Sequence, residues 1–306
     1  MRGSSASFWT ACATASAFRG ADMAEARKLR SVCAMTTVRN DALFLPRWIA
    51  HYGAAFGREN LLVILDGHDQ QLPPDAGPVN LIRLPHQPLP RVPAMRRRAR
   101  VMSDIARGMF RYHDMVIATD VDEFILVDPA LGVDLRAYLS ALSRPPAAIS
   151  ALGLDVGQHL RLEQPLDPAR AFLDQRSFAH VSARYTKPAI ATRPLTWGSG
   201  MHRIKGRNFR IDPNLFLFHF GMVDYQHATG KTADPDRLAT GWEGHLARRE
   251  ALFSHITNAE PLDGDAYFPI ARRRQTWLRP LYAPNKPGMI PGNPVVRIPE
   301  RFRGLV

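Results

Sequence analysis

The sequence predicts an α/β fold in which a mostly parallel sheet is covered by helices on both faces. Two observations support this prediction. Apolar runs of strand length alternate with segments of helical spacing through residues 31–125. Most of each run is apolar, as expected of a strand that is buried on both faces. The chain has 306 residues, 45% of them hydrophobic, which is enough to bury a substantial core.

The predicted strands are short apolar runs that end at polar residues. The second run ends at Asp66-Gly67, and the fourth continues directly into Thr119-Asp120. Continuous apolar runs of this length, rich in β-branched residues, are typical of buried strands. The four strands are predicted at Val32–Val38, Leu61–Leu65, Val79–Leu84 and Met115–Ala118.

Two helices are predicted between these strands. The first begins after Asn40 or Asp41, either of which can cap it. The second extends from about Pro93 to Tyr112, with methionines and alanines on one side and arginines on the other. The first helix has apolar residues at helical spacing, namely Leu45, Trp48, Ile49 and Tyr52.

The pattern is weaker beyond about residue 145, and we expect an irregular C-terminal region. Apolar runs remain at Ala147–Leu154 and Leu215–Phe218, a helix is predicted at about Asp236–Asn258, and a Pro/Arg-rich tail follows. Residues 1–30 are expected to be a disordered extension, and residues 31–306 a single domain. We divide that domain into a nucleotide-side half, 31–145, and an acceptor-side half, 146–306.

Composition restricts the classes of function. The formal charge of +12 suits nucleic acid, an anionic membrane or a phosphorylated substrate. No nucleic-acid fold signature is present, so we favour a phosphate-bearing small substrate and expect no nucleic acid. The chain has two cysteines, Cys12 and Cys33, and no apolar run near the roughly 20 residues that span a bilayer. We expect a cytoplasmic protein, and its charge allows peripheral contact with an anionic inner membrane.

Polar residues follow three of the predicted strands. They are Arg39-Asn40, Asp66 and Asp120-Val121-Asp122. Ligands of parallel sheets bind beyond the carboxyl ends of the strands, so these clusters should converge on one edge. Two carboxylates at a strand end can hold Mn²⁺ or Mg²⁺, which prefer oxygen ligands. Such a cation neutralises the phosphates of a diphosphate sugar donor. A strand-end turn with solvated acids is the alternative interpretation.

The order of these motifs resembles bacterial glycosyltransferases of the family 2-like group. The residues that carry the resemblance are Thr37–Asp41, Leu45–Tyr52, Asp66-Gly67 and Thr119–Phe124, which match a pattern of the form "RNE…L.EW..H", an aspartate after the second strand, and "D.DEF". The match covers about residues 31–128, with weaker similarity around Tyr185–Pro188 and Gly200–His202. It departs from the pattern at Asp41, where the family usually has Glu, and in the loop after Asp66.

The resemblance implies a GT-A (Rossmann-like) fold, a nucleotide-sugar donor (UDP-, GDP- or dTDP-linked) and Mn²⁺ or Mg²⁺. The acceptor would be a carbohydrate, a lipid-linked glycan or a protein. Position by position, Arg39 would face the nucleotide and Asp66 the base or ribose. Asp120 would contact the ribose or the metal, and Asp122 the metal and the diphosphate.

Four further residues are candidates on chemical grounds. Arg96 and Arg100 share one helix face at i and i+4, and arginine forks match phosphate oxygens. A solvated helix face is their alternative. His219 follows an aromatic run and is our choice, over His202, for a further metal ligand. Asp155 is our choice for a general base that takes the proton of the acceptor hydroxyl.

Two other functions remain open. A sugar-phosphate nucleotidylyltransferase would use a related sheet and an acidic metal site. Such enzymes have a Gly-rich loop after the first strand, whereas Thr36–Asn40 contains no glycine. A non-catalytic basic protein would bind nucleic acid or anionic lipid with an affinity that falls steeply with salt and does not depend on Asp122.

Overall fold

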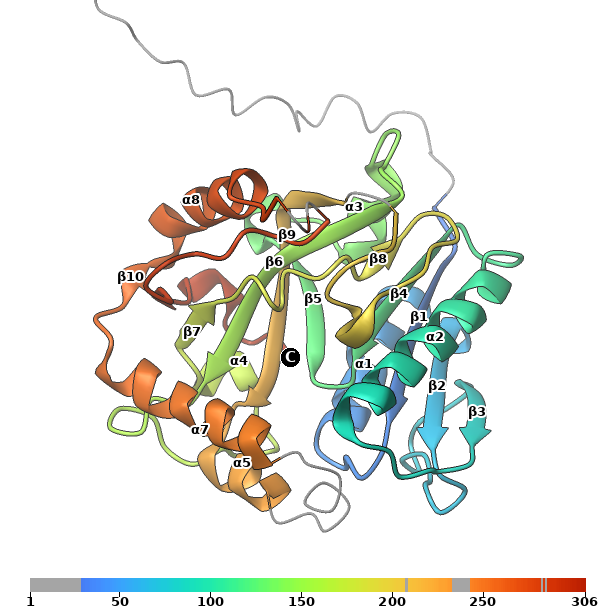
Figure 1. Cartoon of the computed structure of the whole chain (residues 1–306), viewed down its shortest axis with the longest axis horizontal. Helices are drawn as coiled ribbons and strands as arrows, with labels where there is room; N and C mark the ends of the chain where they lie inside the picture. The colour runs from blue at the N-terminus through green and yellow to red at the C-terminus, as the bar shows by residue number, and fades with distance from the viewer. Residues whose placement is uncertain (1–28, 207–208, 233–242, 282, 284) are drawn as a thin grey trace, which may run out of the picture.

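A computed structural model describes residues 29–206, 209–232, 243–281, 283 and 285–306 (Figure 1). Within these residues a single sheet of eleven strands runs through both halves of the chain. Its main path is β10-β11-β7-β6-β8-β4-β1-β2-β3, and β9 pairs with both β5 and β6. The predicted extension 1–30 lies outside the described residues except for Leu29 and Arg30. Arg30 belongs to the fold, because its backbone N–H donates to Ser140 Oγ at 2.9 Å.

The first half is a parallel sheet, as predicted. Strands β2 and β4 flank β1 on either side, and β3 pairs with β2, all in parallel. The bounds agree closely with the sequence analysis because the apolar runs of β1, β2 and β4 are buried and end where polar residues begin. The strands are β1 (Val32–Val38), β2 (Leu61–Asp66), β3 (Asn80–Leu84) and β4 (Met115–Asp120).

Helices α1 (Phe44–Phe56) and α2 (Arg91–Met109) cover opposite faces of this sheet (Figure 1). The reason lies in the period-two alternation of strand side chains. On β1, Val32 and Ala34 share one core cluster with α1, whereas Cys33 and Met35 share the other with α2. The predicted α/β class, with helices on both faces of the parallel sheet, is confirmed. Asp41 caps α1 through Oδ1, which accepts from Phe44 N at 2.9 Å.

The second half is a mixed sheet built on two long strands. β6 and β9 run parallel to each other, and β9 pairs antiparallel with β5 directly after the acidic motif. The shorter strands pair antiparallel with β4, β6 or each other, except that β10 is parallel to β11. The strands are β5 (Glu123–Val127), β6 (Ala148–Gly157), β7 (Phe178–Val181), β8 (Ile190–Ala191), β9 (Arg210–Met222), β10 (Leu262–Asp263) and β11 (Val295–Arg297).

The region predicted as irregular contains helices. The predicted Pro/Arg-rich tail holds α8, whose N-terminus is capped by Asp263, with Oδ1 accepting from Ala266 N at 2.8 Å. The helix predicted at Asp236–Asn258 is observed from Glu243, and its earlier residues lie outside the described part. The helices are α3 (Leu135–Ala141), α4 (Phe172–Gln175), α5 (Tyr225–Thr232), α7 (Glu243–Asn258) and α8 (Gly264–Trp277), with 3₁₀ turns at Arg58–Asn60, Pro129–Leu131, Ser199–Met201 and Glu300–Phe302.

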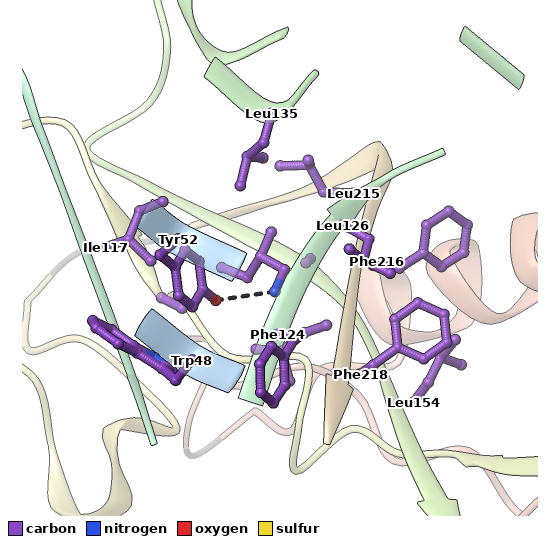
Figure 2. Close-up of a cluster of buried hydrophobic side chains, with 14 of the residues drawn as sticks. Trp48, Tyr52, Ile117, Phe124, Leu126, Leu135, Leu154, Leu215, Phe216 and Phe218 are labelled. Atoms are coloured by element: carbon purple, nitrogen blue, oxygen red, sulfur yellow. Dashed lines mark hydrogen bonds between the residues drawn. The ribbon is translucent and has the colours of Figure 1, made fainter. Parts of the chain in front are cut away.

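A buried aromatic cluster joins the two halves. Trp48 and Tyr52 of α1 pack beside Phe124 of β5, and Phe216 and Phe218 of β9 extend the cluster (Figure 2). The Tyr52 hydroxyl accepts from Ile125 N at 3.0 Å, the bond that is dashed in Figure 2, and donates to Glu123 O at 3.2 Å. The strand that follows the acidic motif is therefore tied to the first helix by buried hydrogen bonds. None of the described helices has the length and apolar character needed to cross a membrane.

Candidate active site at the edge of the parallel sheet

The acidic motif forms a tight turn between two strands. β4 ends at Asp120, Val121 and Asp122 make the turn, and β5 begins at Glu123. Glu123 is fully buried, and its Oε2 accepts from Asp120 N at 3.1 Å. On β9, Phe220 N donates to Asp122 O at 2.9 Å. These two bonds fix the turn, so the carboxylates of Asp122 and Glu123 are held close together.

Asp122, Glu123 and His219 form a cluster suited to a metal ion. One ligand atom from each residue lies within 4.8 Å of the other two. The antiparallel register of β5 and β9 pairs Glu123 directly with His219, which explains why residues so distant in sequence meet. His219 Nε2 lies 3.4 Å from Asp122 Oδ2. Two carboxylates and an imidazole are a donor set that Mn²⁺ accepts, and carboxylate oxygens alone suit Mg²⁺.

Asp155 lies behind His219. The parallel register of β6 and β9 pairs the two residues, and Asp155 Oδ1 lies 2.6 Å from His219 Nδ1. The Tyr185 ring stacks on the imidazole, with centroids 3.8 Å apart. A carboxylate on Nδ1 fixes the tautomer and orientation of a metal-binding histidine. This contact gives Asp155 a positioning role, and its role as general base stays a prediction.

Asp120, predicted to bind the ribose or the metal, is held by two cationic side chains. Lys187 Nζ lies 2.6 Å from Asp120 Oδ2, and Arg98 pairs with Oδ1 of the same carboxylate. Lys187 is buried and also lies 2.5 Å from Glu123 Oε1. Lys187 and Arg98 therefore bring two cations to the carboxylates of Asp120 and Glu123. The predicted roles of Asp120 stay predictions.

The guanidinium of Arg98 is surrounded by carboxylates. Burial lowers the pKa of its guanidinium, and the carboxylates of Glu123, Asp122 and Asp66 oppose that effect. The side chain thus lies among the acids of both predicted clusters, at the ends of β2 and β4. An arginine here could meet diphosphate oxygens in place of, or together with, its present partner Asp120.

Arg39 and Asp66 lie at the same sheet edge, as the sequence predicts. Arg39 Nη1 donates to Asp66 O at 2.9 Å and to Asp69 Oδ1 at 3.0 Å. Hydrogen bonding from Arg39 is the main cause that lowers the pKa of Asp69 to about 2. Asp66 Oδ1 lies 3.2 Å from His86 Nδ1. These contacts close the loops after β1 and β2 around one end of a cavity.

Arg96 and Arg100 are not brought to the site. Both are exposed on α2 and do not line the cavity. The cavity is instead lined by Arg91, Arg97 and Arg98. Arg98 lies one helical turn before the buried Met102, beside the stripe that packs on the sheet. Arg98 lies four residues before Met102, so the helical spacing could have identified it as the arginine of this run that lies nearest the sheet.

The cavity has a volume of about 1350 Å³. It is larger than the roughly 300–1,000 Å³ typical of a site for one small molecule. The site residues that line it are Arg39, Asp66, His86, Arg98, Asp120, Asp122, Asp155, Tyr185, Lys187 and His219. Its lining also includes Arg184, His202 and Lys286. Burial, followed by the charge of Lys187, lowers the pKa of His202 to about 3, and its Nδ1 lies 2.8 Å from Arg184 O. His202 is therefore a neutral lining residue outside the metal-binding cluster.

No protein-family model matches the chain, and no curated protein matches its sequence. Among solved structures, the chain is similar to the crystal structure of mannose-1-phosphate geranyltransferase from Thermus thermophilus, at 10% sequence identity and a TM-score of 0.28. The match covers 75% of this chain and 65%, slightly under two thirds, of that one. At this TM-score the similarity indicates no function.

Proposed function

We propose that the protein is a divalent-metal-dependent glycosyltransferase of the GT-A type, which transfers a sugar from a nucleoside-diphosphate donor. The observation that carries the proposal is the cluster of Asp122, Glu123 and His219 at the carboxyl edge of a parallel sheet. Nucleotides bind beyond this edge in open α/β sheets. An acidic, histidine-containing cluster at that place suits a cation that bridges to a diphosphate.

The residues present fit such a cation. Asp122 and His219 would hold it, with Glu123 beside them and Asp155 orienting the imidazole. When bound, the cation neutralises the diphosphate and so stabilises the leaving nucleotide. Two carboxylates and an imidazole whose ligand atoms lie within 4.8 Å of one another suit a cation rather than an anion. Arg98 and Lys187 keep the acids in place and supply positive charge beside the phosphates.

The remaining lining residues suit a nucleotide and a second substrate. Arg39 and Asp66 lie where the nucleoside would bind, and a carboxylate at Asp66 can accept from a base N–H or a ribose hydroxyl. The cavity continues past the cluster to Arg184 and Lys286. Its volume exceeds what one ligand usually fills, so donor and acceptor can bind together. Bringing two substrates into contact is itself a large part of the rate enhancement in group transfer.

The test is donor turnover by an Asp122→Ala variant. Wild-type protein with Mn²⁺ should release nucleoside diphosphate from one member of a panel of UDP-, GDP- and dTDP-sugars, and EDTA should abolish the release. Asp122→Ala should lose at least about 100-fold in rate while its thermal unfolding stays close to wild type. Asp104→Asn, at an exposed carboxylate on α2, is the matched control and should keep full activity.

Two outcomes would contradict the proposal. Equal turnover by Asp122→Ala and wild type would show that the reaction does not depend on a metal held by Asp122. Formation of pyrophosphate from a nucleoside triphosphate and a sugar 1-phosphate would instead identify a nucleotidylyltransferase. The loop between β1 and α1, residues 39–43, contains no glycine and so lacks the close backbone approach that a glycine-rich phosphate loop provides.

A further inference from the structure

The C-terminal end of α8 and the segment after it expose large apolar side chains. Trp277 is 79% exposed, Leu278 54%, Leu281 100% and Met289 72%. Over the described residues, these four are among eleven large hydrophobic side chains that are exposed. Single exposed apolar residues are ordinary, but a concentration in one short segment marks an interaction surface. We call these four residues the α8 patch.

The loop that carries Met289 packs on the end of α8. Gly288 N donates to Gln275 O, in the last turn of α8, at 2.7 Å. A Cβ atom at Gly288 would lie 2.6 Å from Leu278 O and 3.0 Å from Arg274 O. Only a glycine permits this approach. Met289, the next residue, is thereby placed beside the helix end that carries Trp277 and Leu278.

The segment that carries the patch is basic and contains no acidic residue. From Ala266 to Pro299 the sequence has no aspartate or glutamate. Arg273 and Arg274 are exposed in the last turns of α8, and Lys286 lies in the loop that packs on it. Among the described residues, no carboxylate oxygen lies within 4.0 Å of these three cations. An apolar surface bordered by unopposed positive charge suits an anionic partner.

We propose that the α8 patch docks the protein on an anionic lipid bilayer. Trp277, Leu278 and Leu281 would enter the boundary between head groups and acyl chains, where tryptophan and leucine are favoured. Arg273 and Arg274 would lie against the lipid phosphates, whose negative surface potential attracts basic residues. The proposed contact is made at the surface of the bilayer by α8 and the loop that packs on it.

Docking in this way would bring the cavity close to the membrane surface. Lys286 and Met289 belong to the loop on α8 and also line the cavity. The docking proposal itself rests on exposure and charge at the patch and does not depend on the proposed transferase activity. Its test therefore needs no substrate.

The test is flotation of the full chain with vesicles at low salt. Vesicles of phosphatidylcholine with phosphatidylglycerol should bind the protein, and phosphatidylcholine alone should not. Trp277→Ser with Leu281→Ser should lower the apparent partition constant by about tenfold or more. The matched control is Tyr112→Ser with Leu162→Ser, at positions that are 79% and 67% exposed outside the patch. It should bind like wild type.

A second pair of variants tests the charge. Arg273→Gln with Arg274→Gln should also lower the partition constant about tenfold or more, and 1 M salt, with a Debye length of about 3 Å, should weaken binding of the wild type. Arg111→Gln with Arg193→Gln removes the same charge from exposed positions elsewhere and should have a much smaller effect. All variants change exposed side chains, so circular dichroism should show wild-type folding.

Three results would overturn the proposal. Absence of binding to phosphatidylglycerol vesicles would show that anionic lipid does not occupy the patch. Equal loss of binding in the Arg273/Arg274 and control charge variants would show that net charge alone attracts the protein. A wild-type oligomer that dissociates on Trp277→Ser, seen by size-exclusion chromatography with light scattering, would identify a second copy of the chain as the occupant.

Discussion

Replacing Asp155 by asparagine should weaken metal binding although no proposed ligand is changed. Asp155 Oδ1 lies 2.6 Å from His219 Nδ1, and both side chains are buried. The carboxylate holds the imidazole with Nε2 directed toward Asp122, 3.4 Å away. An asparagine of the same shape can still accept a hydrogen bond, but it carries no charge. Loss of such a partner typically costs about 10–100-fold in metal affinity, or about 1.4–2.7 kcal/mol.

The assay is calorimetric titration with Mn²⁺. A double-mutant cycle of Asp155→Asn and His219→Ala then tests whether the two residues act together. If Asp155 acts through the imidazole, Asp155→Asn should add little to the loss caused by His219→Ala. Asp104→Asn, at an exposed carboxylate, should bind Mn²⁺ like wild type. Full affinity in Asp155→Asn would refute the reasoning. So would an equal further loss in the His219→Ala background, because Asp155 would then act independently of His219.

Three further predictions concern stability. Burial lowers the pKa of His51 from 6.5 to about 4, so the unfolded chain takes up the proton first. The stabilisation from neutral His51 is complete above pH 6.5 and is lost toward pH 4, with about 2 kcal/mol lost at pH 5. Urea unfolding of His51→Gln should therefore show a weaker dependence of stability on pH. A pH dependence equal to that of wild type would exclude His51 as its source. Tyr52→Phe leaves Ile125 N without its buried partner and should cost about 1–3 kcal/mol, read from the urea midpoint. Gly153→Ala would place its Cβ 2.2 Å from the backbone of the facing turn and should cost about 1–3 kcal/mol, whereas Gly108→Ala, with nothing within 4 Å, should not destabilise α2.

The first half of the fold could be predicted because burial there is simple. Each of β1, β2 and β4 has helices on both faces, so its sequence is apolar without interruption and its end is marked by the first polar residue. The predicted Val32–Val38 is the observed β1, and the predicted second strand differs from β2 only by Asp66. The apolar stripe of α2 was also visible, with Met102 and Ala106 buried.

The second half could not be predicted in the same way because its signals are weak or interrupted. β8 and β10 have two residues each, too few for any periodicity. β9 extends from Arg210 to Met222, although only Leu215–Phe218 reads as an apolar run. α8 contains Pro269 and the run Arg272-Arg273-Arg274, a composition that led us to predict an irregular Pro/Arg-rich tail in place of a helix. Tertiary pairing with long neighbours, which a local pattern does not encode, decides these elements.

The site residues that lie at the ends of parallel strands could be predicted from the sequence. Contacts that depend on how two strands pair could not. Asp66 and Asp122 follow parallel strands, so their convergence could be inferred from the general rule for α/β sheets. The contact of Asp155 with His219 depends on the register of β6 against β9, which no sequence pattern revealed. Arg98 pairs with Asp120 of β4, and this contact between α2 and the strand end is likewise not encoded in the sequence pattern.

Lys187, in the second half of the chain, is bound to the acidic turn of the first half. Its buried ammonium pairs with Asp120 and with the fully buried Glu123. The segment that carries it is held against β6, where Gly153 N donates to Thr186 Oγ1 at 2.9 Å. Leaving a buried charge without its partner costs about 3–5 kcal/mol.

A fragment ending near residue 145 would lose Lys187 and would also lose β9, the antiparallel partner of β5. Its Asp120 would keep Arg98 but lose the ammonium of Lys187, and His219 would be missing. The acidic turn is encoded in the first half, but the second half supplies the cation that lets the turn remain buried and the imidazole that completes the cluster. Metal binding should therefore require the whole folded sheet, and the fragment alone should show none.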